Sequence, residues 1–506
     1  MKNLIEISKI VTKKKVKKIE IFDSTSFDST NSKFAEFYEA LCGGKFRNDR
    51  DAATLLYGCS PSHDKYRQLK SRFRKRLFNT LFFIDVNLPG ASNYDRAYFS
   101  CNKEWTLVKI LISNDAHRSA EDLAKSILTT ALKFKFADVI VNCCRILRRY
   151  AADAGDDKQY EVYDEYIKEY NAILDAEMRS EELFQRVLIK YRKPSTEIEE
   201  LKGQLFEYCD ALVSLSEIYE SPVVNYNMFL VWVYRYEMQR DYVSMIEVCN
   251  RAEQYISNNP NYYQEDKLAI FHLKKMCAYL HLKDFKNGRV NVEQSLRTFP
   301  EGSKLWFQFM EYYLLLAFHT ENYINAMAIF NRANNHSKFK YLGMKTQEKW
   351  KIYEAYLNYF LESQPDKIAA LRAQSSRTFR TSTFLNNPLI YPKPLRTFTV
   401  HQVIAQFLFL LEKGNFQQAT ERVDRLRGYI NKQLTNDSQF RMIHFIRLLN
   451  QLAKAGYNLD NLSSVEKHYE RLHATPFMYR GIIQELEVVP FEQLWNYILA
   501  KLKNKA

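Results

Sequence analysis

A run of basic side chains near the N-terminus is the clearest chemical signal in this sequence. Its seven cations are Lys65, Arg67, Lys70, Arg72, Arg74, Lys75 and Arg76. No acidic residue interrupts them after Asp64. Contact with phosphate groups requires cations on an accessible face, and lysine and arginine supply most such contacts in nucleic-acid complexes. These seven residues are therefore a candidate nucleic-acid-binding site.

A single amphipathic helix is predicted to position the run. Its apolar stripe consists of Leu69, Phe73, Leu77, Leu81 and Ile84, whose spacing returns each side chain to one helical face. The cations flank that stripe, with Arg67, Lys70 and Arg74 on one edge and Lys65, Arg72 and Arg76 on the other. Ser62 or Asp64 is predicted to cap the N-terminus of this helix, because both side chains accept hydrogen bonds from first-turn N–H groups.

Two shorter helices are predicted ahead of the basic one, over residues 34–41 and 49–57, with turns at Gly43-Gly44 and Gly58–Pro61. This series resembles a helix-turn-helix module, and more specifically the Arg/Lys-rich second helix of sigma-factor-like readers. The resemblance implies that the helix containing residues 65–76 contacts DNA or RNA. The stretch from Gly58 to Tyr66 is longer than the tight turn of such modules, which favours phosphate contact over base reading.

Two other interpretations of the basic run stay open at this stage. The helix could cap a larger helical array, with its cations paired to nearby acids; the candidates are Glu36, Glu39, Asp49 and Asp51. It could also bind an acidic protein partner, because basic patches attract anions of several kinds.

Motifs for catalysis, metals and cofactors are missing from the sequence. There is no GxxxxGK followed by Ser or Thr, no GxGxxG, no GxSxG and no HExxH. His468 and His473 are five residues apart, which places them on different faces of a helix, and His444 is expected to be a packed core residue. The eight cysteines form no CxxC pair and are expected to be buried, reduced thiols. We expect no catalytic residue, no metal and no cofactor, and a protein that is not an enzyme.

Composition favours an all-α protein. Of 506 residues only 13 are Gly and 12 are Pro, too few for the turns of a many-stranded β fold. The chain is 46% hydrophobic, which excludes disorder as its dominant state. Its 34 Tyr and 34 Phe are expected mainly to fill gaps between helices, or else to line a groove for a partner peptide. No apolar run approaches the ~20 residues that cross a bilayer, so we expect no membrane insertion and a cytoplasmic location.

A recurring junction divides the predicted helices into pairs. Helices are expected over Val224–Met238, Leu268–Leu282, Leu305–Phe318, Gln347–Leu361 and Val403–Leu411. A two-residue polar break followed by an aromatic occurs at Arg240-Asp241-Tyr242, Lys283-Asp284-Phe285, Glu321-Asn322-Tyr323 and Gly414-Asn415-Phe416, and more loosely at Lys135-Phe136-Ala137. Small residues after the junctions, Ala326, Ala328 and Ala419, are expected at close helix crossings. Junctions 43 and 38 residues apart suit stacked helical hairpins.

These junctions resemble those of tetratricopeptide-like (TPR-like) α-solenoids over roughly residues 117–460. The resemblance implies a right-handed α-solenoid of antiparallel helical hairpins that works by binding other proteins. Phe379–Pro394 and Ile483–Leu494 are also similar to an uncharacterised family of large bacterial helical proteins, which implies no activity.

The predicted domains follow from these patterns. They are a basic N-terminal segment (residues 1–33), the basic helical module (34–90), the α-solenoid (91–370), an extended acid-free connector (371–399) and a C-terminal bundle (400–506). Phe379, Phe384, Leu385, Ile390 and Tyr391 are expected to hold the connector against the helices. We expect a non-catalytic scaffold or adaptor for a protein partner, or alternatively a nucleic-acid-binding regulator that uses residues 65–76.

Overall fold

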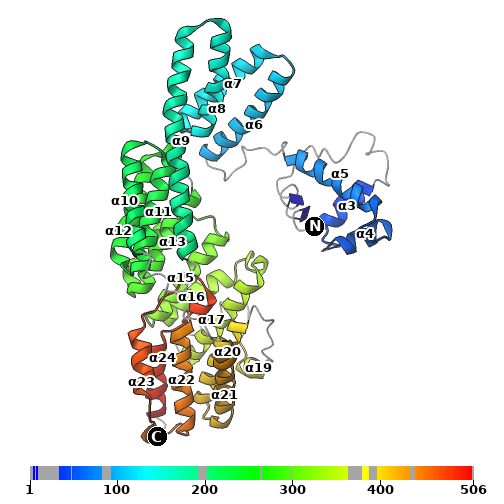
Figure 1. Ribbon diagram of the computed structural model, residues 1–506. Coiled ribbons are helices and arrows are strands. Elements are labelled where there is room, and N and C mark those ends of the chain that lie inside the picture. Colours follow the sequence, from blue (N-terminus) through cyan, green and yellow to red (C-terminus); the bar gives the residue numbers. More distant parts are fainter. Residues whose placement is uncertain are drawn as a thin grey trace. The chain divides into compact units, whose positions relative to one another are not determined.

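The computed structural model describes residues 4–5, 7–8, 33–46, 48–81, 93–191, 202–262, 265–297, 299–362, 379–386, 396–433 and 439–503. Within these ranges the chain is helical and contains no strand, as the sequence predicts (Figure 1). None of the described helices is both long and apolar enough to cross a membrane.

The chain forms two compact units, Met1–Asn171 and Ala172–Ala506. The boundary falls inside α9 (Asp157–Tyr191), within the interval that the sequence assigns to a single solenoid. The other helices of unit 1 are α3 (Lys33–Cys42), α4 (Asp49–Tyr57), α5 (Asp64–Leu81), α6 (Asn93–Ser113), α7 (His117–Phe134) and α8 (Ala137–Ala154).

The N-terminal module of unit 1 consists of α3, α4 and α5 around a small core of its own. Phe37 of α3 contacts Phe73 of α5 with ring centroids 4.4 Å apart, and both rings are fully buried. The apolar stripe predicted for α5 is confirmed for Leu69, Phe73 and Leu77, which are buried, and for Leu81, which packs partly buried against them. Ile84 lies outside the described residues.

The N-terminus of α5 differs from the prediction. His63 precedes the helix, its carbonyl accepts the N–H of Arg67, and its Nδ1 accepts the N–H of Lys65 at 3.3 Å. Asp64 is the first helical residue, and the Ser62 hydroxyl contacts that of Ser60 at 2.6 Å instead. An imidazole nitrogen thus accepts a first-turn N–H in place of the expected side-chain oxygen.

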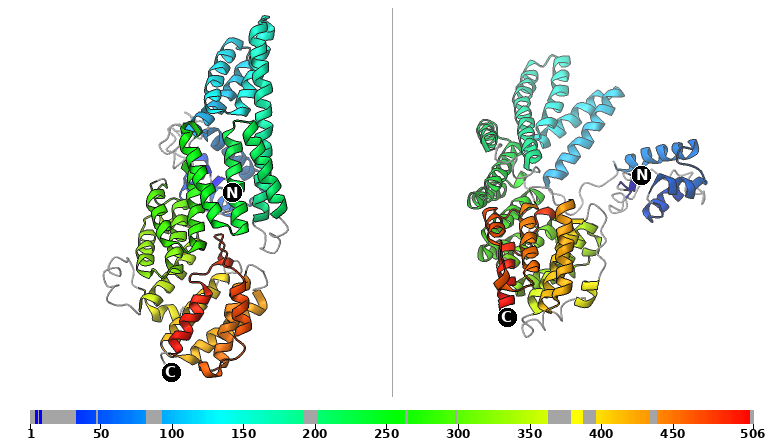
Figure 2. Two further views of the ribbon diagram at one scale, coloured as in Figure 1. Left: turned by 90° about the vertical axis from the view of Figure 1, so that its left-hand side faces the viewer. Right: turned by 60° about the horizontal axis from the view of Figure 1, so that its bottom comes forward.

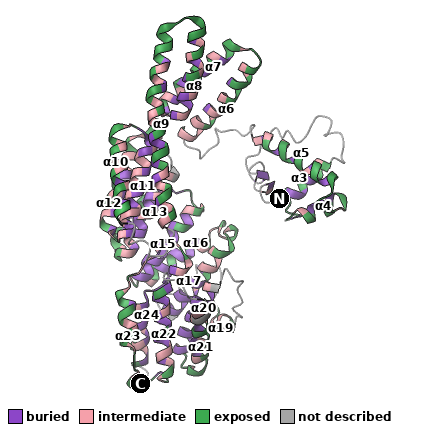
Figure 3. Cartoon of the chain, viewed as in Figure 1, coloured by how far each residue is buried: buried purple, intermediate pink, exposed green. Residues whose placement is uncertain are grey.

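Unit 2 contains the remaining described helices. They are α10 (Lys202–Ile218), α11 (Pro222–Gln239), α12 (Tyr242–Asn258), α13 (Glu265–Leu282), α14 (Phe285–Ser295), α15 (Lys304–His319), α16 (Tyr323–Asn334), α17 (Met344–Glu362), α19 (Thr381–Asn386), α20 (Arg396–Glu412), α21 (Phe416–Gln433), α22 (Phe440–Lys454), α23 (Glu466–Ala474) and α24 (Phe491–Lys503). All five helices predicted in this region by name are confirmed. Figure 2 shows α20 to α24 packed as a bundle, and Figure 3 shows buried residues concentrated along α15, α17 and α20.

The junctions predicted in unit 2 have a common geometry. Arg240, Lys283, Glu321 and Gly414 all have a positive φ between 53° and 69°, and an aromatic residue opens each following helix. Asp241 and Asp284 accept the N–H groups of Ser244 and Asn287 and so cap α12 and α14. The left-handed conformation costs a non-glycine residue roughly 1–2 kcal/mol, so packing and capping must compensate at three of these four sites.

The small residues after the junctions are only partly as expected. Ala326 and Ala419 are completely buried where neighbouring helices approach, as predicted. Ala328 is exposed, so its predicted role at a helix crossing is wrong. It is two residues from Ala326, and that spacing points the two side chains to different faces of α16.

The interval 371–399 is not extended throughout. Thr381–Asn386 forms α19, and residues 396–399 belong to α20. The expected packing is confirmed for Phe379, Phe384 and Leu385, which lie partly buried against the core. Phe379 and Phe384 both contact the Phe409 ring, with centroids 6.0 and 5.9 Å away. Ile390 and Tyr391 lie outside the described residues.

An irregular segment joins α23 to α24. Residues 475–490, called the strap below, contain only a short 3-10 turn at Ile483–Glu485. Tyr479, Leu486, Val488 and Val489 are nonetheless buried. A connection with so little regular structure must satisfy its polar groups through side chains of the helices that cover it.

Candidate nucleic-acid interface

The basic run lies on the outside of the α5 helix. Tyr66, Leu69, Phe73, Leu77 and Thr80 form its buried face. With about 100° between successive residues, the cations lie to the sides of this face and opposite it. Lys65, Arg67, Arg72, Arg74 and Lys75 are exposed. These five residues are called the basic face below, and the distance from Lys65 to Lys75 along the axis is about 15 Å.

Lys70 is held by α4 and does not belong to the basic face. Its Nζ lies 2.6 Å from Asp49 Oδ1, and the same oxygen accepts the hydroxyl of Tyr66 at 2.7 Å. Partial burial opposes ionisation of Asp49, but the hydrogen bonds from Lys70 and Tyr66 outweigh it and lower the pKa of this carboxyl. The Lys70–Asp49 pair therefore stabilises the contact between α4 and α5.

Arg76 and Arg74 each lie over an aromatic ring. The Arg76 guanidinium is 4.8 Å from the centroid of Phe34, and that of Arg74 is 5.5 Å from the centroid of Phe78. Arg76 is half-buried and belongs to the edge of the core, whereas Arg74 is exposed. Arginine stacked on a ring keeps its N–H groups free to contact phosphate.

The remaining cations have little neutralising charge around them. Arg67 lies 3.6 Å from Asp64, but both side chains are largely exposed, and such a pair contributes at most about 1 kcal/mol. In the described chain, no ion pair neutralises Lys65, Arg72 or Lys75. Glu36, one of the acids expected to pair with the run, bonds to Lys33 at 2.7 Å. Lys70, paired with Asp49, therefore fits the interpretation of the run as a cap with paired edges.

A second charged cluster, around the strap of unit 2, has no counterpart in the sequence interpretation. Glu237 of α11 is buried and accepts the hydroxyl of Tyr191 at 2.6 Å as well as an ion pair from Lys274 of α13. Burial opposes the charge of Lys274, but the Glu237 carboxylate raises the pKa of this ammonium above its ordinary value. The Lys274 Nζ also lies 4.1 Å from the Tyr234 ring centroid.

Glu311 of α15 is the second buried carboxylate of this cluster. It accepts hydroxyl hydrogen bonds from Tyr353 at 3.0 Å and from Tyr479 of the strap, and it pairs with Lys349 at 2.5 Å. Burial raises the pKa of Tyr479 and Tyr353 well above the ordinary value, and the Glu311 charge adds to this. Both phenols therefore stay protonated and act as donors.

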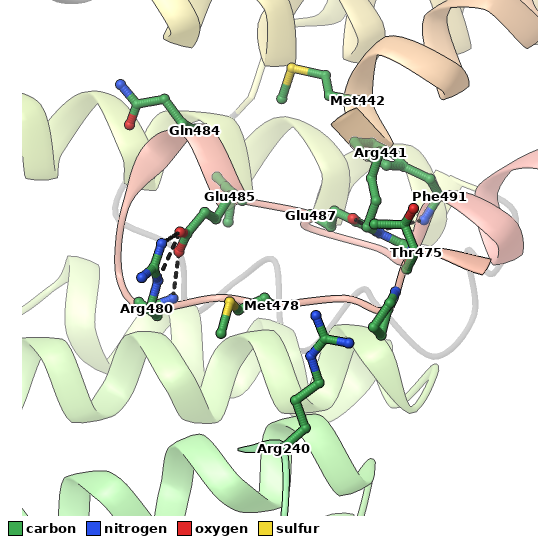
Figure 4. A pocket seen from close by; sticks show the side chains of 12 residues that line it. Arg240, Arg441, Met442, Thr475, Met478, Arg480, Gln484, Glu485, Glu487 and Phe491 are labelled. Atoms are coloured by element: carbon green, nitrogen blue, oxygen red, sulfur yellow. Dashed lines mark hydrogen bonds and ion pairs between the residues drawn. The ribbon is translucent and has the colours of Figure 1, made fainter. Parts of the chain in front are cut away.

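Two arginines hold the strap, Arg480 at its middle and Arg441 at its two ends (Figure 4). Arg480 pairs with Glu485 inside the strap and donates to the carbonyl of Tyr191. Arg441 of α22 pairs with Glu487 and, at 2.7 Å, with Glu492, and it donates to the Leu472 carbonyl at 2.8 Å. The two cavities beside the strap have volumes of about 50 and 340 Å³, and Arg441 lines both. Figure 4 shows Arg240 projecting from the end of α11 toward the smaller one.

Three histidines bond to the backbone of the strap. His281 Nε2 accepts the N–H of Tyr479 at 3.2 Å while its Nδ1 donates to the Cys277 carbonyl at 2.8 Å. His319 Nε2 donates to the Glu487 carbonyl at 2.8 Å, and His401 Nε2 lies 3.4 Å from the Ile483 carbonyl. Burial lowers the pKa of all three imidazoles, to about 3 for His319 and about 4 for His401. The strap is therefore held by neutral histidines and compensated charges.

The other candidate residues are placed as follows. His444 is buried, as predicted, and its Nδ1 lies 3.3 Å from that of His468. None of the eight cysteines forms a disulfide, and six of them are buried; burial raises the pKa of Cys101 and Cys209 to about 11, which keeps both as thiols. Cys42 is exposed, so the prediction of burial is wrong for it. Across the described residues, no group of three or more His, Cys, Asp or Glu is arranged to hold a metal ion.

Comparisons of this chain with protein-family models, with curated proteins and with solved structures gave no match.

Proposed function

We propose that this chain is a non-enzymatic binding protein that contacts the phosphates of DNA or RNA through the basic face of α5. The observation that carries the proposal is the exposure of five cations on one helix that internal acids leave almost unneutralised. A polyanion releases its condensed counterions when such cations approach its phosphates, and this release drives binding. The resemblance of α3, α4 and α5 to a helix-turn-helix module supports the same assignment.

Phosphate binding has a distinctive dependence on salt that tests the proposal. The full-length protein is titrated against fluorescent DNA and RNA between about 50 and 200 mM salt, and the slope of log K against log salt is measured. In the triple variant Arg72→Gln, Arg74→Gln and Lys75→Gln, we expect the slope to become shallower by about 2–3, because each phosphate contact contributes roughly 0.7–0.9. Affinity at low salt should fall at least tenfold.

A matched control separates the basic face from net charge. Lys286, Lys345 and Lys413 are exposed lysines of unit 2. Their replacement by Gln removes the same three charges and should leave affinity and slope unchanged. If the α5 triple variant keeps the wild-type slope, the proposal is wrong. If nucleic acid does not bind but a polyglutamate peptide does, the partner is an acidic protein.

We also propose that the helices downstream of the basic module form a TPR-like, right-handed solenoid of helical hairpins that serves as a scaffold for a cytoplasmic protein partner. Four junctions of one type support this: each has a left-handed residue, then an Asp or Asn, then an aromatic that opens the next helix. Recurring junctions of this kind suit repeats that bury their faces only by stacking.

Purification of the tagged protein from its native cells, with and without nuclease, tests the scaffold. A protein that stays bound after nuclease treatment and then binds the purified full-length chain directly supports it. Co-purifying proteins that all depart with the nucleic acid would contradict it.

A further inference from the structure

One aromatic ring is exposed on the same side of α5 as its cations. Phe78 follows Arg74 by four residues and Lys75 by three, which places it within about 60° of both around the helix axis. Its side chain is 39% exposed, whereas Phe73, which points into the core, is completely buried. The Arg74 guanidinium lies 5.5 Å from the Phe78 ring centroid.

Phe78 is an exposed phenylalanine among cations. On a solvated helix the ring gains only its contact with Arg74, while its exposed apolar area is unfavourable. The ring does not contribute to the module's core, which consists of Phe37, Phe73, Leu77 and their neighbours. Phosphate contact alone would be served equally well by a polar residue.

We propose that Phe78 is a stacking platform for an unpaired base, so that the basic face binds single-stranded nucleic acid in preference to duplex. This inference rests on the proposed function of α5 and names its substrate class. Non-specific single-strand binders combine cations that follow the backbone with rings on which bases stack. In a duplex the faces of the bases are covered by their neighbours, so Phe78 has no partner there.

The neighbouring cations suit this arrangement. Arg74 already stacks on Phe78, and a guanidinium plane is itself a surface on which bases stack. Lys75, one helical turn before Phe78, is exposed and in position to contact a phosphate beside the stacked base. A second exposed ring of the module, Tyr57, is 36% exposed and has the Lys33 ammonium 5.7 Å from its centroid.

The test compares an unstructured single strand with a duplex of the same length at one salt concentration. Wild-type protein should bind the single strand about tenfold more tightly than the duplex. Phe78→Leu, which keeps an apolar side chain but removes the ring face, should reduce single-strand affinity five- to tenfold and leave duplex affinity unchanged. Phe78→Tyr should retain wild-type affinity, because it keeps the ring.

Salt dependence and a control variant separate this inference from the function on which it rests. The salt slope should be identical for wild type and Phe78→Leu, since no phosphate contact is removed. Leu55→Ala alters another exposed apolar residue of the module, 47% exposed on α4, and should have no effect. Equal affinity for single strand and duplex, or no loss in Phe78→Leu, overturns the stacking role while the charge variants still test phosphate binding. A wild-type slope in the charge variants overturns the proposed function itself.

Discussion

On α5, five arginine and lysine side chains are exposed and almost unneutralised, whereas around the strap of unit 2 Lys274, Lys349, Arg441 and Arg480 are largely buried and each pairs with a carboxylate. The two regions use the same chemical groups in opposite surroundings. In water, a cation is well solvated and needs no partner. In the interior, it is tolerated only when an acid and hydrogen bonds replace the lost solvation.

The two regions therefore differ in how the chain itself compensates its charged side chains. Each buried charge of the strap cluster is matched by groups of the same chain, so the cluster is complete without a ligand. The cations of the basic face, in contrast, are exposed to solvent and almost unneutralised by acids of the chain. Substitutions in the strap cluster should accordingly reduce the free energy of unfolding, and substitutions in the basic face should reduce binding.

The largest expected effect on stability is at Glu237. Replacing it with Gln leaves Lys274 buried without its counter-charge, and loss of one partner from a buried pair typically costs about 3–5 kcal/mol. Chemical unfolding of the full-length protein, followed by tryptophan fluorescence, should show this loss in the free energy of unfolding. Trp232 and Trp306 of unit 2 report on the region.

An exposed ion pair of unit 2 serves as the control for that measurement. Glu182 bonds to Arg179 and to Arg186 with all three side chains substantially exposed. Glu182→Gln should leave the free energy of unfolding nearly unchanged, because solvent screens an exposed pair. A Glu237→Gln loss no greater than this would mean that the buried cluster contributes no more than a surface pair.

The next largest expected effect is a decrease in the free energy of unfolding in mild acid. Folding lowers the pKa of His281, His319 and His401, because burial disfavours their charged form. The folded chain therefore binds fewer protons than the unfolded chain below pH 6.5, and its stability falls as the pH decreases. Each histidine contributes about 1.4 kcal/mol per pH unit, a loss that continues to about pH 4 for His401 and about pH 3 for His319.

Urea unfolding at pH 6.5 and pH 5.5 measures this dependence. His319→Gln places an amide donor near the position of Nε2, so that the bond to the Glu487 carbonyl is kept while the titrating group is lost. The variant should have a smaller pH dependence than wild type, because one of the five histidines whose pKa burial lowers, a set that also includes His444 and His468, no longer titrates. An unchanged dependence would show that carboxylates, and not these histidines, determine it.

Only part of this structure could be predicted from the amino-acid sequence. The buried stripe of α5 and the junctions of unit 2 were predictable, because each depends on residues within a few turns of one another. The N-cap of α5 was missed because His63 is not a typical capping residue, and the left-handed φ of Arg240, Lys283 and Glu321 was missed because none is glycine.

The burial of the strap could not be predicted from the sequence for a different reason. Tyr479 bonds to His281 and Glu311, which are 198 and 168 residues away in the sequence. No local pattern signals such a contact, and Tyr, Arg and Glu in a short stretch between Pro476 and Pro490 are typical of an exposed loop. The basic face was recognisable by composition, but the small number of its acidic partners became evident only from the positions of Asp49 and Glu36.

A moderate effect is expected inside the N-terminal module. Tyr66→Phe removes the hydroxyl that donates to Asp49 and leaves the Lys70–Asp49 pair in place. The net contribution of such a hydrogen bond is about 1 kcal/mol. The module lacks tryptophan, so hydrogen exchange of the α5 amides is the suitable measurement. Tyr57→Phe, at an exposed ring, should leave the exchange of α5 unchanged.

The smallest expected effect is that of the triple variant Arg72→Gln, Arg74→Gln and Lys75→Gln on the stability of the N-terminal module. Lys75 is one turn from Arg72, so these two like charges repel along the helix by about 0.2–0.5 kcal/mol. Removing Arg72, Arg74 and Lys75 should leave protection of the α5 amides unchanged or slightly increased. If these three side chains slightly destabilise the module but are needed for binding, their role is in binding and not in folding. A loss of more than about 1 kcal/mol in the same exchange measurement would instead assign these cations a structural role like that of Lys70.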